Sequence, residues 1–296
     1  MTKTTEAVNP ASRGIDAEPL GEVLRIISSE DSSTAGAVSA QLPVIERAVE
    51  KVVDTIRRGG KVFMVGAGTS GRLCVLEAAE VPPTFGVSTN LFQGVVAGGV
   101  PALSGSVEAA EDDPEAAKAE LRRRGLGSLD LVLGVAASGS TPYTLGAVRY
   151  ARQVGAATVG LSCNIGSELS RLVDTPIEVV VGSEVVAGST RMKSGTAQKM
   201  VLNMVTTATM IRLGRVHDGY MVGVQASSAK LADRSRRTLS SLTGLAPMEA
   251  GKALKLAGGD LRVALVMTLA GAEEDKAREA LEGWVSVREA LRRLEA

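Results

Sequence analysis

Aromatic side chains and net charge are both scarce in this chain. Aromatic residues make up 2% of the 296 positions, which leaves few rings on which nucleic-acid bases could stack. Lys plus Arg and Asp plus Glu balance at 33 each, so no excess charge attracts the chain to a polyanion. We therefore expect no nucleic-acid partner.

Cysteine and histidine are also rare. The two cysteines, Cys74 and Cys163, each lie in an apolar segment and form no metal-type pair. This placement favours buried, reduced thiols. The single histidine, His217, has no serine or metal-ligand partner at a recognisable spacing, so we expect a structural or surface role for it.

Long apolar runs are missing as well. No stretch approaches the ~20 apolar residues that a membrane-spanning helix needs. The first residues, MTKTTEAVNPASRG, lack the apolar core of a signal peptide. We therefore expect a cytoplasmic protein with no membrane partner.

Short apolar runs, by contrast, recur and alternate with helix-compatible segments. The runs are KVFMVGAG (61–68), LFQGVVAGG (91–99), LVLGVAASGST (131–141), ATVGLSC (157–163) and IEVVVG (177–182). Parallel strands that are buried on both faces have this continuous apolar character. The alternation predicts an α/β fold with a parallel sheet flanked by helices.

Helical patterns precede and follow these runs. A pattern over 33–58, with Pro43 as a break, ends at Gly59-Gly60, and a long helix is predicted over 190–213. After Gly219 the pattern is wholly helical. The predicted organisation is an N-terminal helical segment, a sheet domain and a C-terminal helical module, at 1–51, 52–220 and 221–296.

Two glycine-rich loops follow predicted strands and carry hydroxyl side chains. The first, VGAGTSGR (65–72), offers Thr69, Ser70 and Gly71 at the start of a helix. The second, ASGSTPY (137–143), offers Ser138, Gly139, Ser140 and Thr141. Free N–H groups and the helix dipole at such positions favour anions. Capping of the helices by these hydroxyls is the alternative interpretation.

The anion that these loops predict is a phosphate on a small sugar. Neither loop contains the Gly-Lys-Ser/Thr of a Walker motif, and Gly71 breaks the spacing of a dinucleotide loop. Ligands of open α/β sheets bind outside the carboxyl ends of the strands. Hydroxyl and backbone donors without a lysine suit a sugar phosphate better than a nucleoside triphosphate.

Several longer motifs resemble one family. GAGTSGRLCVLEAAEVPPTFG, SVEAAEDD, AASGSTPY, GLSCNIGS and GSTRMKSGTAQKMVLNM are similar, in order and spacing, to N-acetylmuramic acid 6-phosphate etherases. The likeness runs from about residue 9 to 235. It implies a sugar isomerase (SIS) fold, a homodimer, and no metal or organic cofactor. It also implies cleavage of a lactyl ether to N-acetylglucosamine 6-phosphate and D-lactate, in cell-wall sugar recycling.

The sequence departs from the family pattern at a few positions. Ser140 stands where the family usually has Arg, Glu77 where it often has Asp, and Ser194 where it often has Ala. The missing Arg removes one cation near the second loop, although Ser138 and Thr141 remain.

Such a reaction needs one base and one acid. Removal of the proton on carbon 2, next to the carbon 1 aldehyde, lets lactate leave from carbon 3, and water then adds. The resemblance implies that Glu80 donates a proton to the leaving lactate and that Glu111 is the second carboxylate, which we assign as the base. Glu108 is the rival for the base, and Glu77 is a weaker rival for the acid.

The position of Glu80 before Pro82-Pro83 predicts how it holds its proton. If the prolines end the helix there, the negative end of the helix dipole disfavours a charged carboxylate. Glu111 is likewise expected at a helix end, before Asp113 caps the next helix. Both residues also have a simpler explanation as solvated surface acids.

Polar residues cluster where the long helix is predicted to start. Glu184, Ser189 and Lys193, with Thr190 and Arg191 between them, could bring hydroxyls and cations to the sugar. Capping and surface pairing are the alternative. Two other functions remain open: a sugar-phosphate-binding regulatory protein of the SIS fold, similar to the glucokinase regulatory proteins, and an aldose–ketose isomerase.

Overall fold

The computed structural model describes residues 4–224 and 229–295, and these form two compact units. The first unit contains residues 4–79 and Asn90–Thr206. The second contains Glu80–Thr89 and residues 207–295. No local pattern in the sequence indicates that Glu80–Thr89 belongs with the C-terminal part of the chain. The domain boundaries expected at 51/52 and 220/221 stay predictions.

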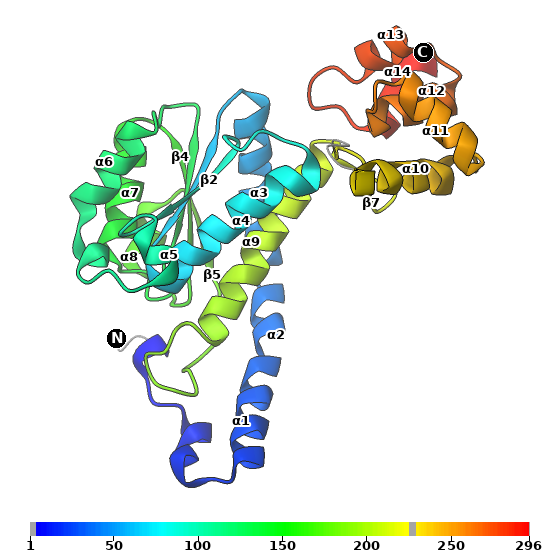
Figure 1. Ribbon diagram of the computed structural model, residues 1–296. Coiled ribbons are helices and arrows are strands. Elements are labelled where there is room, and N and C mark those ends of the chain that lie inside the picture. The colour runs from blue at the N-terminus through cyan, green and yellow to red at the C-terminus, as the bar shows by residue number, and fades with distance from the viewer. Residues whose placement is uncertain (1–3, 225–228, 296) are drawn as a thin grey trace. The chain divides into compact units, whose positions relative to one another are not determined.

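A five-stranded parallel sheet forms the centre of the first unit (Figure 1). Its order is β2-β1-β3-β4-β5. The strands are β1 (Val62–Gly66), β2 (Phe92–Val96), β3 (Leu131–Val135), β4 (Ala157–Ser162) and β5 (Thr175–Glu178). Every residue of β1 and β3 is buried, which explains why these strands read as unbroken apolar runs. The predicted α/β fold is confirmed.

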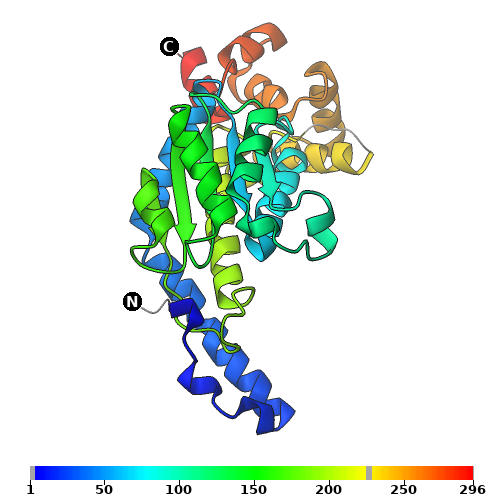
Figure 2. The same ribbon diagram turned by 90° about the vertical axis from the view of Figure 1, so that its left-hand side faces the viewer.

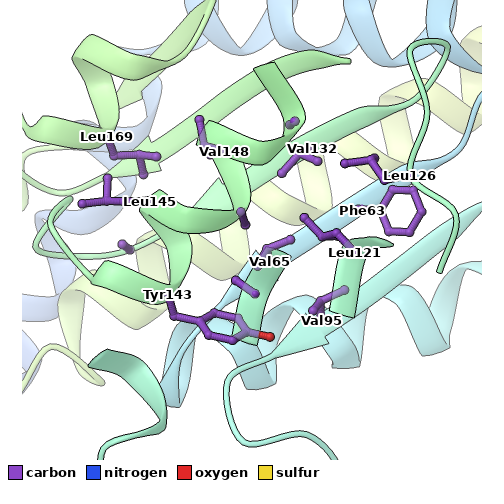
Figure 3. Close-up of a cluster of buried hydrophobic side chains, with 14 of the residues drawn as sticks. Phe63, Val65, Val95, Leu121, Leu126, Val132, Tyr143, Leu145, Val148 and Leu169 are labelled. Carbon is purple, nitrogen blue, oxygen red and sulfur yellow. The ribbon is translucent and has the colours of Figure 1, made fainter. Parts of the chain in front are cut away.

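Helices cover both faces of this sheet. On one face, α6 (Pro114–Arg123), α7 (Pro142–Gln153) and α8 (Glu168–Leu172) pack on a buried cluster around Phe63, Val132 and Leu145 (Figure 3). On the other face, α3 (Leu42–Arg57) contacts β1 and β5 through its apolar stripe. This layering buries the sheet and leaves the loops at the strand ends to carry function.

The N-terminal residues of the first unit are helical, as predicted. The predicted break at Pro43 is confirmed, because α2 (Thr34–Ser39) ends before it and α3 takes it into its first turn. The remaining short elements are η1 (Thr4–Glu6), η2 (Pro10–Ser12), η3 (Ile15–Ala17), α1 (Leu20–Ser32), α5 (Pro101–Ser104) and η4 (Ala110–Asp112).

The expectation that Pro82-Pro83 ends a helix is wrong. Helix α4 (Gly68–Phe85) continues through both prolines and closes at Gly86, whose N–H donates to the carbonyl of Pro82 at 2.9 Å. Gly86 has a φ of 62°, the left-handed value of a helix C-terminus. Val81 and Phe85 are buried one turn apart, so packing of the last turn outweighs the two backbone donors that the prolines lack.

The second unit is mostly helical, but the expectation that the chain is wholly helical after Gly219 is wrong, because Tyr220–Met221 pairs as a short strand with Val216–His217. The long helix α9 (Lys193–Arg212) leads into it, and Figure 2 shows the C-terminal residues, in orange and red, as a group of helices. A buried cluster around Leu239, Leu261 and Leu265 forms its core. Its elements are β6 (Val216–His217), β7 (Tyr220–Met221), α10 (Ala229–Thr243), α11 (Pro247–Leu256), α12 (Leu261–Ala270), α13 (Glu274–Ala280) and α14 (Val287–Glu295). None of the helices in the described ranges combines the length and apolar character needed to cross a membrane.

Candidate functional site

The order in which the chain adds strands to the sheet reverses between β1 and β3. Strand β1 lies between β2 and β3, and the chain passes from β1 to β2 on one side but from β3 to β4 on the other. Such a topological switch point is where open α/β sheets bind ligands. Gly66 at the end of β1 pairs with Val135 at the end of β3, so the two hydroxyl-rich loops leave the sheet side by side.

The glycines of the first loop have different tasks. A Cβ on Gly66 would lie 2.8 Å from the backbone nitrogen of Gly71, and a Cβ on Gly71 would lie 2.5 Å from the carbonyl oxygen of Gly66. These two glycines therefore let the end of β1 touch the first turn of α4. Gly68 has a φ of 51° and open space around it, so it serves the left-handed turn.

The two hydroxyl-bearing residues of the first loop lie beside α9. Ser70 is 8% exposed and donates a hydrogen bond to Oε1 of Gln198 at 2.9 Å. Thr69 is half-buried beside a hollow of about 330 Å³ that Arg191, Thr196 and Lys199 also line. Arg191 and Lys199 therefore bring two cationic side chains close to the first loop, although Lys199 is paired with Glu77.

The second loop is a tight turn with its hydroxyls half-buried. Gly139 has a φ of 66°, and its N–H donates to the carbonyl of Ala136 at 2.9 Å. The backbone N–H and the hydroxyl of Ser140 both lie 3.2 Å from Oγ of Ser138. Thr141 occupies the N-cap position of α7, yet within the described chain its side chain makes no capping hydrogen bond. Simple helix capping therefore does not account for Thr141.

The loop after β4 braces the second loop. Nδ2 of Asn164 donates to the carbonyl of Ala137 at 3.1 Å, and the N–H of Leu169 donates to the carbonyl of Gly139 at 2.9 Å. A Cβ on Gly139 would lie 2.3 Å from Cβ of Ser167. Sequence reasoning missed Asn164 and Ser167, because contacts between residues more than 25 positions apart leave no local pattern.

The polar cluster before α9 holds the helix start. Both oxygens of the fully buried Glu184 accept backbone N–H groups, from Lys193 and Ser194, at 2.9 Å. Lys193 is 3% exposed, and its Nζ lies 2.5 Å from Glu30, so the ammonium group holds the pKa of that carboxyl below its usual value. Capping and ion pairing thus occupy Glu184 and Lys193. Binding roles for them and for the half-buried Ser189 stay predictions.

Glu77, the rival acid, is engaged inside the first unit. It is 4% exposed, and its carboxylate lies 2.5 Å from Nζ of Lys199 and 2.5 Å from Oγ1 of Thr206. Both partners lie on α9, so Glu77 links α4 to α9 within the first unit by an ion pair and a hydrogen bond.

The two proposed catalytic carboxylates lie in different units, and both are exposed. Glu80 belongs to the second unit and stands five residues before the end of α4. Glu111 lies in the first unit within the single 3-10 turn η4, so the helix end expected there is wrong. Asp113 does cap α6, as predicted, by accepting the N–H groups of Glu115 and Ala116. The catalytic roles of Glu80 and Glu111 stay predictions.

The two thiols are buried and free, as expected. Burial raises the pKa of the Cys163 thiol to about 12 and also raises the pKa of Cys74. Neither is a reactive nucleophile in the folded chain. Within residues 4–224 and 229–295, the side chains of His, Cys, Asp and Glu form no cluster of three that could hold a metal ion.

Comparison with known folds defines the class of protein. Residues 44–152 match the family model of the glucokinase regulatory protein N-terminal SIS domain. The structure of phosphoheptose isomerase GmhA from Neisseria gonorrhoeae superposes with a TM-score of 0.51 and 16% sequence identity, covering 64% of this chain and 98% of that one. The parallel sheet and its helical layers are therefore an SIS-type fold.

Curated relatives then define the family. An N-acetylmuramic acid 6-phosphate etherase from Rubrobacter xylanophilus is 50% identical over 97% of this chain and 95% of the relative. Another, from Clostridioides difficile, is 43% identical over 98% and 96%. The chain belongs to the N-acetylmuramic acid 6-phosphate etherase family.

Proposed function

We propose that this protein cleaves the D-lactyl ether of N-acetylmuramic acid 6-phosphate. The products are N-acetylglucosamine 6-phosphate and D-lactate, and the setting is the recycling of cell-wall amino sugars. The observation that carries the proposal is that relatives named for this activity match at 43–50% identity over nearly the whole chain. The paired hydroxyl loops at the switch point of the sheet give the substrate phosphate a place to bind.

The second loop is proposed as the main phosphate cradle. Ser138, Ser140 and Thr141 supply hydroxyls, and the left-handed Gly139 shapes the turn. The loop opens directly into α7, a helix of 12 residues whose first N–H groups and dipole favour an anion. Thr69 and Ser70 of the neighbouring first loop, which Gly71 holds against β1, complete the proposed binding set.

Proton transfer accounts for each chemical step. Glu111 takes the proton from carbon 2 of the open-chain sugar, and the electrons displace the ether oxygen from carbon 3. Glu80 gives its proton to that oxygen, so lactate leaves as a neutral alcohol at its hydroxyl. Water then adds across the double bond, placing a hydroxyl on carbon 3 and a hydrogen on carbon 2. The steps call for no redox group.

The regulatory alternative has one observation in its favour, the match of residues 44–152 to a regulatory-protein domain. That match covers about a third of the chain, whereas the etherase relatives cover nearly all of it. We therefore prefer the enzyme. The aldose–ketose isomerase remains a weaker candidate, because the isomerase likeness extends to the fold alone.

Assembly and location follow from the same proposal. We propose a homodimer, as the family resemblance implies, and a cytoplasmic site of action. A phosphorylated sugar carries a charge that the hydrocarbon core of a membrane excludes, so the reaction belongs in the compartment where the sugar phosphate is held.

The test is release of D-lactate from N-acetylmuramic acid 6-phosphate by the purified protein. The unphosphorylated sugar is the matched control, because the proposed loops recognise the phosphate. Stoichiometric D-lactate from the first sugar and little from the second supports the proposal. Binding of the sugar phosphate without release of lactate would favour the regulatory alternative.

A further inference from the structure

Ser70 and Gln198 form a buried pair whose hydrogen bonds are incompletely used. Oγ of Ser70 donates its only proton to Oε1 of Gln198 at 2.9 Å. Gln198 is 1% exposed, and within the described residues its Nε2, which carries two N–H donors, has no hydrogen-bond partner. A buried amide nitrogen without an acceptor is unfavourable, so this arrangement calls for an explanation.

The pair also conflicts with the binding role proposed for Ser70. A phosphate oxygen accepts hydrogen bonds, so Ser70 must donate its proton to bind one. A serine hydroxyl has a single proton and two lone pairs. While that proton points at Gln198, Ser70 presents only lone pairs to an anion.

One rotation of the amide frees the Ser70 proton and gives one of the two N–H groups an acceptor. Turning the Gln198 amide by half a turn about its Cγ–Cδ bond exchanges the places of Oε1 and Nε2 without changing the shape of the side chain. Nε2 then donates to Oγ of Ser70, which accepts with a lone pair. The Ser70 proton is then free to bond elsewhere, and one of the two N–H groups of Nε2 has an acceptor.

We propose that Gln198 is a positioning residue that switches Ser70 from a donor toward α9 into a donor toward the substrate phosphate. The proposal rests on the sugar-phosphate site described above and deepens it. Gln198 makes no contact with the substrate itself. It holds Ser70 as an acceptor when the ligand is bound, so that the charge-assisted bond from the hydroxyl to the phosphate forms.

Two substitutions of similar size separate this role from simple packing. Gln198→Glu keeps the shape but offers only acceptor oxygens when ionised, so it keeps the Ser70 proton turned away from the ligand. Gln198→Met keeps the volume and removes all polar atoms, so the Ser70 proton is free. A packing role predicts that the methionine variant, which loses the hydrogen bond outright, is at least as damaging as the glutamate variant.

The experiment measures the Kd of N-acetylglucosamine 6-phosphate by calorimetry for these variants in the Ser70 and Ser70→Ala backgrounds. We expect Gln198→Glu to raise Kd by about tenfold, the loss of ~1.4 kcal/mol of binding, and Gln198→Met by less than about threefold. With Ser70→Ala, the effect of Gln198→Glu should shrink to about twofold or less, because its target hydroxyl is gone. An undiminished effect in that background would overturn the proposal.

A spectroscopic measurement keeps the proposal testable if the glutamate variant fails to fold. The side-chain amide signal of Gln198 is assigned in a ¹H–¹⁵N spectrum by its loss in Gln198→Met. We expect one N–H of this amide to shift when the sugar phosphate is added to the wild-type protein and to stay in place in Ser70→Ala. An amide signal that ignores the ligand in both proteins contradicts the proposal.

The two readouts distinguish this inference from the proposed function. Binding without lactate release, together with the expected coupling between Ser70 and Gln198, would refute the etherase activity and support the switch. Lactate release with no coupling would do the reverse. A wild-type protein that binds no sugar phosphate would refute both.

Discussion

The carboxylate of Glu77 lies 2.5 Å from Nζ of Lys199, and this ion pair joins the middle of α4 to α9. Thr206 donates to the other oxygen of the same carboxylate. The acid is almost fully buried and the lysine is one-third exposed, so the pair is partly shielded from water. Loss of Glu77 would take the counter-charge from a partly buried cation and the shortest hydrogen bond from a buried hydroxyl, although Lys199 keeps a bond to Asn203 and Thr206 one to Leu202.

Replacing Glu77 by alanine should therefore destabilise the protein. We expect the free energy of unfolding to fall by about 2–4 kcal/mol, measured by urea unfolding. The exposed pair of Glu22 with Arg25 provides the matched control, and Glu22→Ala should cost less than about 1 kcal/mol. Equal losses of stability in the two variants would contradict a stabilising role for the buried contacts of Glu77.

Substitution of Gly139 should harm the second loop more than its backbone angle alone predicts. Gly139 and Gly99 share left-handed φ values, 66° and 65°, but only Gly139 has a neighbour in the way of a Cβ. Ser167, that neighbour, is fixed because it caps α8. We expect Gly99→Ala to cost about 1–2 kcal/mol of stability.

Gly139→Ala should cost more stability than Gly99→Ala and should also weaken sugar-phosphate binding. Thermal unfolding and calorimetry measure the two effects. If both alanine variants bind N-acetylglucosamine 6-phosphate as the wild type does, the second loop does not hold the phosphate.

Substitution of the proposed acid and base should change activity without changing the stability of the fold. Glu80, Glu111 and Glu108 are all exposed in the chain, so changing each to glutamine should leave the melting temperature unchanged. We expect Glu80→Gln and Glu111→Gln to lower kcat by about 10²–10⁴-fold, because each removes a proton-transfer group. Glu108→Gln is the control and should stay within about twofold of wild type. An inactive Glu108 variant beside an active Glu111 variant would reverse the assignment of the base.

The buried thiols predict a pH dependence of stability. Their raised pKa values keep both protonated in the folded chain, whereas the thiols of an unfolded chain ionise near pH ~8.5. Their contribution is complete below that pH and is lost as the pH rises, by about 1.4 kcal/mol per pH unit for each thiol.

Urea unfolding at pH 7.5 and 9.5 measures this loss, and Cys163→Ala should reduce the slope by about half. Iodoacetamide at pH 8 should label neither cysteine in the folded protein and both after unfolding. Rapid labelling of the folded chain would contradict the burial of the thiols.

The sequence predicted the parts of the fold that local patterns encode. Four of the five apolar runs contain the strands β1 to β4, because residues such as Leu131 and Val132 must be apolar when both faces of the sheet are covered. The fifth run, 177–182, overlaps β5 (Thr175–Glu178) only at its first two residues. Asp113 before Pro114 marked a helix start, and the structure has one there. The two hydroxyl loops lie next to each other because parallel neighbouring strands have their carboxyl ends on the same side of the sheet.

Sequence reasoning failed where distant residues decide. Pro82 and Pro83 carry strong local helix-breaking character, yet burial of Val81 and Phe85 keeps the helix intact through them. Glu184 lies nine and ten residues from the N–H groups that it caps, and no sequence rule marks that spacing. Its role at the sugar stays a prediction. The partnership of Ser70 with Gln198 spans 128 residues and was equally invisible.

The most direct test of the central claim follows the oxygen atom. The protein is incubated with N-acetylmuramic acid 6-phosphate in ¹⁸O-labelled water, and both products are analysed by mass spectrometry. Elimination followed by hydration predicts one labelled oxygen on carbon 3 of N-acetylglucosamine 6-phosphate and unlabelled D-lactate. Label in the hydroxyl of lactate, or no lactate at all, would contradict the account.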